Sequence, residues 1–304
     1  MSLRIGILSR LPRGYSTERL REAGLRAGHR VRVLDTLRVS LLIAGRRPKL
    51  FYRGEKLGRY DAIVPRIGAS VSAYGAAVVE QFEHAGVFTP APAQAIRASR
   101  DKLRALSLLA HHGIRVPETV CVRDRASIRR AVRQVGGPPA VVKLPEGTQG
   151  TGVILADSYR LAESVLEALL VTQKSVLVQR FVRESRGRDI RAFVVGGRVV
   201  AAMQRRAAPD DFRSNVHRGG RIERRTLEPS LARVAVRSAE VLGLGIAGVD
   251  LMEGDDGPLV LEVNSSPGLE GIERATGIDV AGAIVEYLEA EVAQRSAEPT
   301  PESV

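Results

Sequence analysis

The 304-residue sequence contains one cysteine, Cys121, and no tryptophan, and aromatic residues make up only 4% of it. A single cysteine excludes a disulfide within the chain, which fits a reducing compartment. The scarcity of aromatic side chains argues against a protein that stacks nucleic-acid bases on its rings. No apolar run approaches the length of a membrane span, and no signal-peptide pattern is present. These absences lead us to expect a cytoplasmic protein without membrane association.

Signatures of covalent catalysis and of zinc binding are also missing. The sequence has no Gly-x-Ser-x-Gly segment to present a serine nucleophile. Cys121 lies in an apolar stretch with no evident base, and its position is typical of a core residue. The five histidines do not show the spacing of metal ligands. We therefore expect no acyl-enzyme chemistry.

Positive charge is in excess. The chain has 46 basic and 34 acidic residues, which gives a net charge of +12. Such a charge attracts acidic partners such as nucleotides, acidic peptides or RNA-rich particles, but it is equally compatible with general solubility. Hydrophobic residues make up 44% and charged residues 26%, as in ordinary globular proteins. The length suggests two or so folding units.

The first hundred residues alternate between apolar strands and helical patterns. We expect strands over residues 3–8, 31–34 and 60–64, and helices over 17–27 and 73–85. This alternation predicts a small open α/β domain over residues 1–98. The proline-rich stretch at residues 89–92 closes it.

The last two thirds mix antiparallel hairpins with helices, which predicts α+β structure. A helix opens at Ser99, and further helices are expected over 127–135, 160–170 and 230–242. Strands are expected over 116–122, 140–144, 153–156, 175–182, 190–195, 198–204, 248–252 and 258–263. Residues 293–304, rich in Ser, Glu, Pro and Thr, are expected to form a disordered tail.

A glycine-rich loop at residues 146–152 reads Glu-Gly-Thr-Gln-Gly-Thr-Gly. It is neither a P-loop, since Val153 follows where Lys would stand, nor a dinucleotide fingerprint, since the glycine spacing is reversed and a strand follows. The loop therefore joins two antiparallel strands. It is either a flap whose backbone N–H groups approach phosphates or a simple turn.

Two lysines strengthen the interpretation of the loop as a flap over phosphates. Lys143 is the only charge in the apolar strand that precedes the loop, although a solvent-facing position would also explain it. Lys102 lies in the first turn of its helix, where a cation opposes the helix dipole. A bound anion would account for Lys102, and so would compensation by adjacent Asp101.

An acidic hairpin carries the strongest set of candidate ligands. Glu262 and Asn264 are two residues apart on one strand, so their side chains share a face. The turn at residues 254–257 brings Asp250 roughly opposite Glu262. Two carboxylates and an amide oxygen suit Mg²⁺ shared with phosphate oxygens. The alternative is a surface hairpin with scattered acids, but the strands are otherwise apolar, so burial is expected.

Arginines supply further candidate anion contacts. Arg191 follows Asp189 on a strand, Arg205 and Arg206 end the next strand, and Arg213 opens a polar loop. Planar guanidinium groups match phosphate and carboxylate. Any single one of them would be unremarkable on a surface, and only their grouping near the acidic hairpin suggests a site.

These features together resemble the ATP-grasp superfamily, and several stretches resemble the RimK family within it. The resemblance covers about residues 3–290. It is carried by residues 7–10, 65–68, 100–104, 142–152, 189–191, 211–220, 247–250 and 262–273. It implies an N-terminal α/β domain over residues 1–98 and an α+β ATP-grasp fold, whose central subdomain (99–187) and C-terminal subdomain (188–292) clamp ATP.

The resemblance also implies roles for individual residues. Nucleotide contacts are expected from Lys102, Lys143, Gly147, Thr148, Gln149, Gly150, Gln179, Arg180, Phe181, Asp189, Arg213, Ser214 and Asn215. Catalytic roles are expected for Arg191, Arg213 and Asn215, and metal ligation for Asp250, Glu262 and Asn264. The implied cofactors are ATP and two ions of Mg²⁺ or Mn²⁺.

One position departs from the family pattern. The hinge beside the adenine usually carries an acid before the aromatic residue, whereas this chain has Arg180 before Phe181. A guanidinium cannot accept a hydrogen bond from the adenine amino group. The adenine contact of Arg180 is therefore in doubt, and backbone groups or Gln179 are the alternatives.

The implied activity is the addition of L-glutamate, through an acyl phosphate, to the acidic C-terminal tail of a ribosomal protein, with poly-α-glutamate as a further product. Ribosome association and a homotetramer are implied as well. Two alternatives remain: an ATP-grasp ligase with another acceptor, such as a carrier protein or cofactor precursor, and a non-catalytic ribosome- or RNA-binding relative. The intact set of Lys143, Asp250, Glu262 and Asn264 argues against the last.

Overall fold

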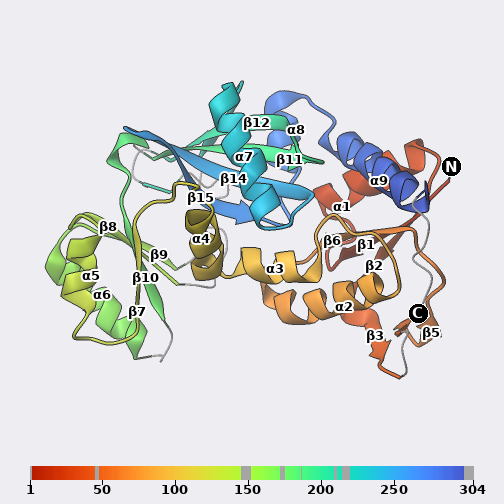
Figure 1. Ribbon diagram of the computed structural model, residues 1–304, viewed down its shortest axis with the longest axis horizontal. Helices are drawn as coiled ribbons and strands as arrows, with labels where there is room; N and C mark the ends of the chain where they lie inside the picture. Colours follow the sequence, from red (N-terminus) through yellow and green to blue (C-terminus); the bar gives the residue numbers. More distant parts are fainter. Residues whose placement is uncertain are drawn as a thin grey trace.

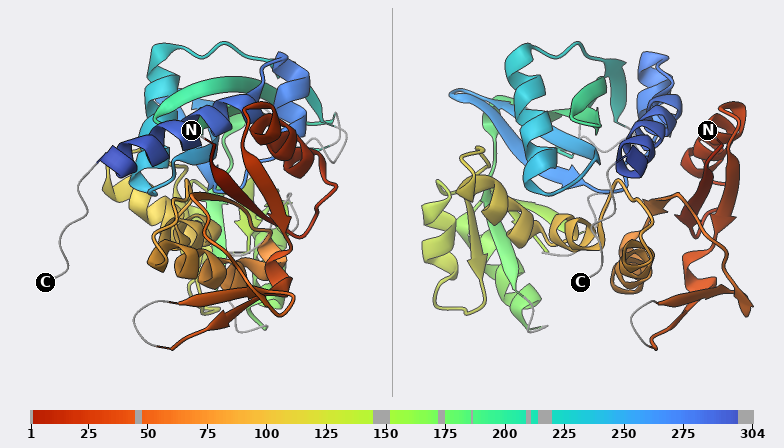
Figure 2. Two further views of the ribbon diagram at one scale, coloured as in Figure 1. Left: turned by 90° about the vertical axis from the view of Figure 1, so that its right-hand side faces the viewer. Right: turned by 45° about the vertical axis from the view of Figure 1, so that its right-hand side comes forward.

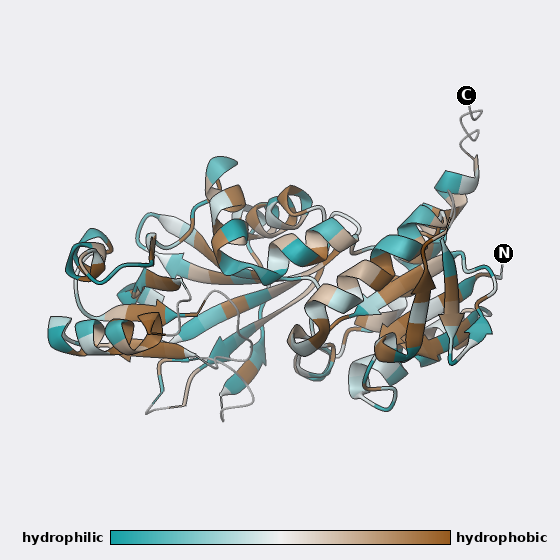
Figure 3. Cartoon of the chain, turned by 90° about the horizontal axis from the view of Figure 1, so that it is seen from below, coloured by the Kyte–Doolittle hydropathy of each residue, from teal (hydrophilic) through white to brown (hydrophobic). Residues whose placement is uncertain are grey.

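The computed structural model describes residues 2–44, 48–144, 152–171, 175–185, 187–208, 211–213 and 220–297. They form an N-terminal, a central and a C-terminal unit (Figure 1). The C-terminal unit lies between the other two along the long axis of the molecule (Figures 1 and 3). None of the helices in these ranges combines the length and hydrophobicity that crossing a membrane requires.

The N-terminal unit is an open α/β structure, as expected. Its parallel sheet has the order β2-β1-β6, formed by β1 (Arg4–Ser9), β2 (Arg30–Leu34) and β6 (Ala62–Arg66). Helices α1 (Tyr15–Arg26) and α2 (Ser72–His84) connect to it. Strand β1 is buried along most of its length, so its apolar side chains form the centre of this unit.

A small antiparallel sheet inserted before β6 was not predicted. It consists of β3 (Val39–Leu42), β4 (Lys49–Tyr52) and β5 (Glu55–Lys56), and the 3-10 helix η1 (Thr36–Arg38) precedes it. The turn between β4 and β5 places Arg53 and Gly54 at φ of 54° and 86°. Two-residue hairpin turns of this kind usually carry Asn-Gly or Asp-Gly, so Arg-Gly gave little signal.

The start of the next helix was placed wrongly. Ser99 does not open a helix, because it is a buried residue inside α3 (Ala93–Arg100). A second helix, α4 (Lys102–His111), starts directly after it. Asp101 separates the two with an extended backbone, and its side chain accepts a hydrogen bond of 3.1 Å from the N–H of Arg104. This N-cap ends one helix and begins the next.

The central unit is a four-stranded antiparallel sheet with two helices on it. Its strand order is β7-β10-β8-β9. The elements are β7 (Thr119–Val122), α5 (Ile128–Gln134), β8 (Ala140–Lys143), β9 (Val153–Ala156), α6 (Tyr159–Leu170) and β10 (Val176–Arg180). The glycine-rich loop does join two antiparallel strands, β8 and β9, although residues 145–151 themselves lie outside the described part of the chain.

The C-terminal unit is built on a larger antiparallel sheet of order β13-β12-β11-β14-β15. Its strands are β11 (Arg188–Val195), β12 (Arg198–Arg206), β13 (Arg221–Arg224), β14 (Ile246–Gly254) and β15 (Gly257–Asn264). Its helices are η3 (Arg183–Ser185), α7 (Pro229–Val241), α8 (Glu270–Thr276) and α9 (Val280–Ala297). The α+β prediction for this region is confirmed.

The C-terminal helix α9 packs against α1 of the N-terminal unit (Figure 2). It runs to Ala297, so residues 293–297 are helical and the expected tail cannot begin at residue 293. Val292 is buried in the same cluster, because this face of α9 covers apolar side chains of the N-terminal unit. Residues 298–304 lie outside the described part of the chain.

The apolar cores show which units are tied together. Two clusters each combine side chains of the N-terminal sheet with side chains of the C-terminal sheet. The central unit has a cluster of its own, drawn from residues 122–178. In Figure 3 the strands at the centre of the units are largely hydrophobic, whereas the outer loops are hydrophilic. The N- and C-terminal units therefore share cores, and the central unit folds around a separate one.

Candidate active site

A pocket of about 1070 Å³ is lined by residues of all three units. Every candidate site residue that the structure describes is part of its lining: Lys102, Lys143, Gln179, Arg180, Phe181, Asp189, Arg191, Arg213, Asp250, Glu262 and Asn264. The candidates Gly147, Thr148, Gln149, Gly150, Ser214 and Asn215 lie outside the described residues. Lys102 and Asn264, which are 162 positions apart in sequence, are thus brought into one pocket, and the individual roles of the candidates stay predictions.

Lys143 is held in place by a short chain of hydrogen bonds. Its Nζ donates to Oε1 of Gln179 at 2.6 Å, and Nε2 of Gln179 donates to Oγ1 of Thr119 at 2.8 Å. Burial lowers the pKa of Lys143 to about 8, while the charge of Glu262 acts to raise it and that of Lys102 to lower it further. A buried ammonium beside a second cation is well placed to bind an anion.

The hinge arginine is engaged with acids. Nε of Arg180 lies 2.5 Å from Oε2 of Glu118, and Nη1 lies 3.2 Å from Oε1 of Glu184. Burial lowers the pKa of Arg180, but the hydrogen bonds and charges of these two carboxylates outweigh it and raise the pKa overall. Both polar atoms of the Gln179 side chain already form a hydrogen bond within the pocket, so the backbone of the hinge is the better candidate for a contact with adenine.

Apolar side chains line the pocket beside the hinge. The rings of Phe181 and Phe212 meet edge to face, with centroids 6.2 Å apart and planes at 74°. Val141, Met252 and Leu261 line the same pocket. Such a surface suits a flat aromatic base. Phe212 escaped the sequence analysis because an isolated Phe in a polar loop carries no pattern of its own.

Arginines and aspartates alternate in a buried chain of ion pairs behind the pocket floor. Arg205 binds both carboxylate oxygens of Asp189 at 2.6 and 2.7 Å, and its Nη2 also lies 2.9 Å from Oδ2 of Asp250. Arg191 holds Asp250 through two parallel contacts of 2.7 Å each. Burial raises the pKa of Asp250, but the two arginines outweigh it and keep the pKa below its usual range. Asp250 is therefore ionised, and both of its oxygens contact arginine.

Glu262 stands in contrast to Asp250. The two residues face each other across β14 and β15, as the sequence predicted. Glu262 forms no hydrogen bond or ion pair with any residue in the described ranges. Asn264 shares its face, and its amide nitrogen donates a bond of 3.4 Å to the carbonyl of Gly248.

These three oxygen donors fit a magnesium ion by type. Within the described ranges no group of three or more His, Cys, Asp or Glu side chains could hold a metal, so an ion here depends on the amide of Asn264 as well as on the two carboxylates. Glu262 is available directly. Oδ2 of Asp250 already contacts both Arg191 and Arg205, whereas Oδ1 accepts a single bond from Arg191 and keeps a lone pair that a metal could use.

Arg213 connects the C-terminal unit to the glycine-rich hairpin. Its Nη1 donates to the carbonyl of Val153, the first residue of β9, at 3.4 Å. Asp211 holds the same guanidinium, with Nε 2.9 Å from Oδ1. Arg213 thus lies where the hairpin meets the C-terminal sheet.

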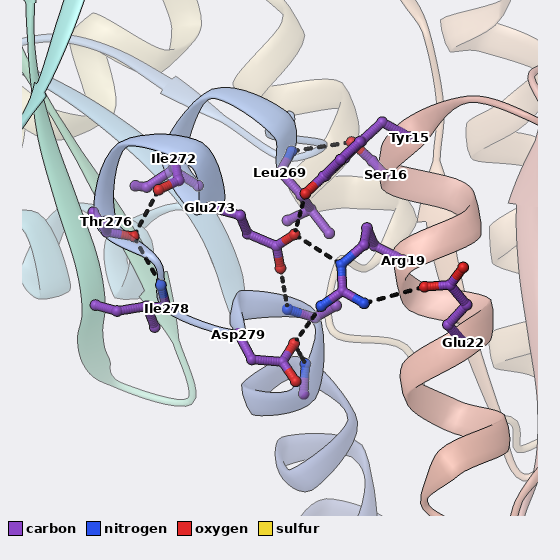
Figure 4. A network of polar contacts seen from close by, with 12 residues as sticks. Tyr15, Ser16, Arg19, Glu22, Leu269, Ile272, Glu273, Thr276, Ile278 and Asp279 are labelled. Carbon is purple, nitrogen blue, oxygen red and sulfur yellow. Dashed lines mark hydrogen bonds and ion pairs between the residues drawn. The ribbon is translucent and has the colours of Figure 1, made fainter.

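The wall opposite the hinge is formed by the segment that follows Asn264, and the N-terminal unit holds it in place (Figure 4). The N–H of Leu269 donates to Oγ of Ser16 at 3.0 Å. Buried Glu273 accepts hydrogen bonds of 3.0 Å from the hydroxyl of Tyr15, from Nε of Arg19 and from the N–H of Ala281. Helix α1 is therefore tied by hydrogen bonds to the loop after Asn264 and to helix α8.

The comparisons with known proteins agree with this architecture. Residues 3–96 match the RimK PreATP-grasp domain, and residues 99–288 match the RimK-like ATP-grasp domain. The chain belongs to the RimK family of ATP-grasp proteins. It is 53% identical over 290 residues to a probable alpha-L-glutamate ligase of Rhodopirellula baltica, which covers 95% of this chain and 72% of that protein. It is 52% identical over 287 residues to a protein of the same description in Azotobacter vinelandii (94% and 95% covered).

A solved structure shows the same fold. The ATP-grasp ligase PsnB, complexed with minimal precursor, Mg and ADP, superimposes with a TM-score of 0.74 at 23% identity, covering 95% of this chain and 98% of that one. The resemblance to RimK and the predicted fold class are thereby confirmed. This RimK-family chain is an ATP-dependent carboxylate–amine ligase.

Some pocket residues of this RimK-family chain were not found from the sequence. Arg66 and Arg100 line the pocket although neither was given a role, and Thr119 anchors Gln179. Arg66 and Arg100 lie within stretches that resemble RimK, which was the one signal available. Their contacts join residues 33 and 201 positions apart, so no local pattern could have revealed them.

Proposed function

We propose that the protein is an ATP-dependent L-glutamate ligase that extends the acidic C-terminal tail of a ribosomal protein. The observation that carries the proposal is the single pocket in which the cations Lys102 and Lys143 meet the oxygen donors Glu262 and Asn264. The relatives named probable alpha-L-glutamate ligase, at 50% identity or more over most of the chain, support glutamate as the added amino acid.

The distribution of apolar and cationic residues in the pocket suggests how ATP would be oriented. The adenine would lie against Phe181 and the apolar side chains, and its phosphates would extend toward Lys143 and Lys102. The ammonium of Lys143 is oriented by Gln179, so little reorganisation is needed when the phosphates bind. Asp250, Glu262 and Asn264 would hold Mg²⁺, which supplies charge neutralisation at the phosphates. Phosphoryl transfer depends mainly on such positioning and neutralisation.

The proposed reaction proceeds through an acyl phosphate. A carboxylate oxygen of the acceptor attacks the γ-phosphorus, and the bond to the β-phosphate oxygen breaks to release ADP. The amino group of glutamate then attacks the acyl carbon and displaces inorganic phosphate. Of the two protons that the ammonium group gives up, one leaves with phosphate and one goes to solvent. No side-chain nucleophile is needed, which agrees with the absence of one in the sequence.

Part of the pocket lining suits an acidic, flexible acceptor. It includes Arg10, Arg66 and Arg274, and the net charge of the chain is +12. Positive potential around a pocket raises the local concentration of acidic peptides. Each added glutamate would leave a new terminal carboxylate, so the product could serve as acceptor again.

The test is ADP release by the purified protein with ATP, Mg²⁺ and glutamate, with and without a peptide of a ribosomal-protein C-terminus, followed by mass spectrometry. We expect ADP release that depends on the peptide, and peptide masses that increase in glutamate steps. Free oligoglutamate without peptide modification would instead identify a poly-α-glutamate synthetase. No release of ADP with either acceptor would contradict the proposal.

A further inference from the structure

Two arginines at the pocket have no acidic partner. Arg66 ends β6 and Arg100 ends α3, and both line the pocket. Nη1 of Arg66 donates to the carbonyl of Pro267 at 2.5 Å, and Nη2 of Arg100 donates to the carbonyl of Ile67. Neither forms an ion pair with a carboxylate in the part of the chain that the structure describes.

Both guanidiniums have hydrogen-bond donors left over. A guanidinium carries five N–H groups, and each of these two uses one contact that the structure records. Nε of Arg100 is buried and has no hydrogen-bond partner within the described residues. Buried donors are nearly always satisfied in folded proteins, so an orphaned one at a pocket wall indicates a missing acceptor.

The electrostatics of the two arginines also indicate a bound anion. Burial lowers the pKa of Arg66 to about 10, and the neighbouring charge of Arg100 adds to this effect. Burial also lowers the pKa of Arg100, and only Glu262 counteracts it. Glu262 is also the candidate ligand of a metal ion, which would compete for its charge. Two adjacent, partly buried cations that face only the carboxylate of Glu262 are costly, and a bound anion reduces that cost.

The position of the pair suggests which anion binds. A recess of the pocket is lined by Arg100, Lys102, Glu262 and Asn264, so Arg100 borders the phosphate end. Arg66 donates to the carbonyl of Pro267, in the segment of the pocket lining that follows Asn264. The pair therefore lies next to the site expected for the phosphates, and the carboxylate to be phosphorylated must also approach those phosphates.

We propose that Arg66 and Arg100 bind the terminal carboxylate of the acceptor and hold it for attack on the γ-phosphate. The assignment rests on the proposed ligase function and adds the residues that recognise the acceptor. Guanidinium groups match the planar carboxylate and neutralise its charge as it approaches the phosphates. The same contacts would retain the acyl phosphate until glutamate attacks it. Arg66 would make the N-terminal unit part of the active site.

The experiment compares a free acid with an amide. Two peptides end in Glu-Glu, one with a free C-terminal carboxylate and one amidated, and their affinities are measured in the presence of Mg²⁺ and a non-hydrolysable ATP analogue. Because charge-assisted hydrogen bonds contribute about 1.5–3 kcal/mol, we expect the wild-type protein to prefer the acid by roughly 10- to 100-fold. Arg66→Gln and Arg100→Gln should reduce this preference below about threefold and leave affinity for the ATP analogue within about twofold.

The controls separate recognition from folding. Arg104→Gln removes an exposed arginine of α4 outside the pocket and should behave as wild type. Arg66→Lys keeps the positive charge but lacks the planar guanidinium group. It should give an intermediate preference for the free acid, provided that its melting temperature is unchanged. If Arg66→Gln and Arg100→Gln keep the preference for the acid, the assignment is wrong. If they lose affinity for the ATP analogue about tenfold and still prefer the acid, the arginines bind phosphate instead.

Measurements of turnover distinguish failure of the arginine assignment from failure of the proposed ligase function. If the wild-type protein elongates the free-acid peptide and the glutamine variants do so with unchanged KM and kcat, only the arginine assignment fails. If the wild-type protein adds no glutamate to this peptide or to a ribosomal-protein tail, the proposed function fails and the assignment fails with it.

Discussion

Lys143 donates a 2.6 Å hydrogen bond to Gln179, and this contact fixes the ammonium at the centre of the pocket. Gln179 is itself anchored on Thr119, so the orientation of the lysine depends on two neighbouring strands, β10 and β7. Gln179, a candidate contact of adenine, thus orients the residue expected to contact the phosphates, and its own role toward the base stays a prediction.

Affinity for nucleotide should fall as the pH rises through 8. Burial lowers the pKa of Lys143 to about 8, and phosphate binding requires the charged form. We expect the Kd for an ATP analogue to increase several-fold between pH 7 and pH 9, with proton uptake on binding near pH 8. Lys143→Arg stays charged in this range and should flatten the dependence. A wild-type Kd that is constant across this range would contradict the assignment.

The same pKa has the opposite effect on stability. The pKa of Lys143 in the folded protein lies below its ordinary value of 10.5, so between about pH 8 and 10.5 the unfolded state binds more protons. The contribution of Lys143 to the free energy of unfolding therefore increases as the pH rises through this window. Nucleotide binding and intrinsic stability should thus respond to pH in opposite directions.

Asp250 and Glu262 should differ when each is neutralised. Both Asp250→Asn and Glu262→Gln are expected to lower ligase turnover by at least about a hundredfold, since both are candidate metal ligands. Only Asp250→Asn removes the ion-pair partner of Arg191 and one of the two partners of Arg205, and breaking a buried ion pair costs about 3–5 kcal/mol. Chemical denaturation should show this loss for Asp250→Asn and almost none for Glu262→Gln. Equal stability of the two variants would argue against the buried network.

Removal of the hinge arginine should have little effect on nucleotide binding. Glu118 and Glu184 hold the guanidinium of Arg180, so it is not free to contact adenine. We expect Arg180→Gln to change the Kd of an ATP analogue by less than about threefold. Phe181→Ala is the matched comparison, and loss of base stacking should weaken binding by about 1–3 kcal/mol. A tenfold loss in Arg180→Gln would restore the arginine as an adenine contact.

Glu273 should stabilise the contact between the N-terminal and C-terminal units. It accepts hydrogen bonds from Tyr15, Arg19 and Ala281, and it is buried. Glu273→Gln should destabilise the protein by about 1–3 kcal/mol, because a hydrogen bond to a charged group is lost in a buried setting. Tyr15→Phe removes one donor only and should cost about 1 kcal/mol. Denaturant titrations would measure both losses of stability. A larger loss for Tyr15→Phe than for Glu273→Gln would contradict this role of Glu273.

The candidate residues of the pocket could be predicted from the sequence, and their roles stay predictions. Apolar strands interrupted by single charges identified Lys143, Asp250 and Glu262, because a charge in such a strand needs a partner. Strand periodicity placed Asp250 opposite Glu262, and the register of β14 and β15 confirms that pairing. Long ordered motifs identified the family and thereby the order of the units.

Tertiary structure alone decided how these groups are used. Whether Asp250 is free or bound by two arginines depends on β11, β12 and β14 lying side by side, which no local pattern specifies. Arg66 and Pro267 are 201 residues apart, and they meet because the N- and C-terminal units share apolar cores. Helix α9 continues through the exposed residues 293–297, where the guanidinium of Arg295 lies 4.6 Å from the ring centroid of Phe88 in the N-terminal unit. Local propensity acts over a few residues, whereas burial and charge pairing act wherever the fold brings surfaces together.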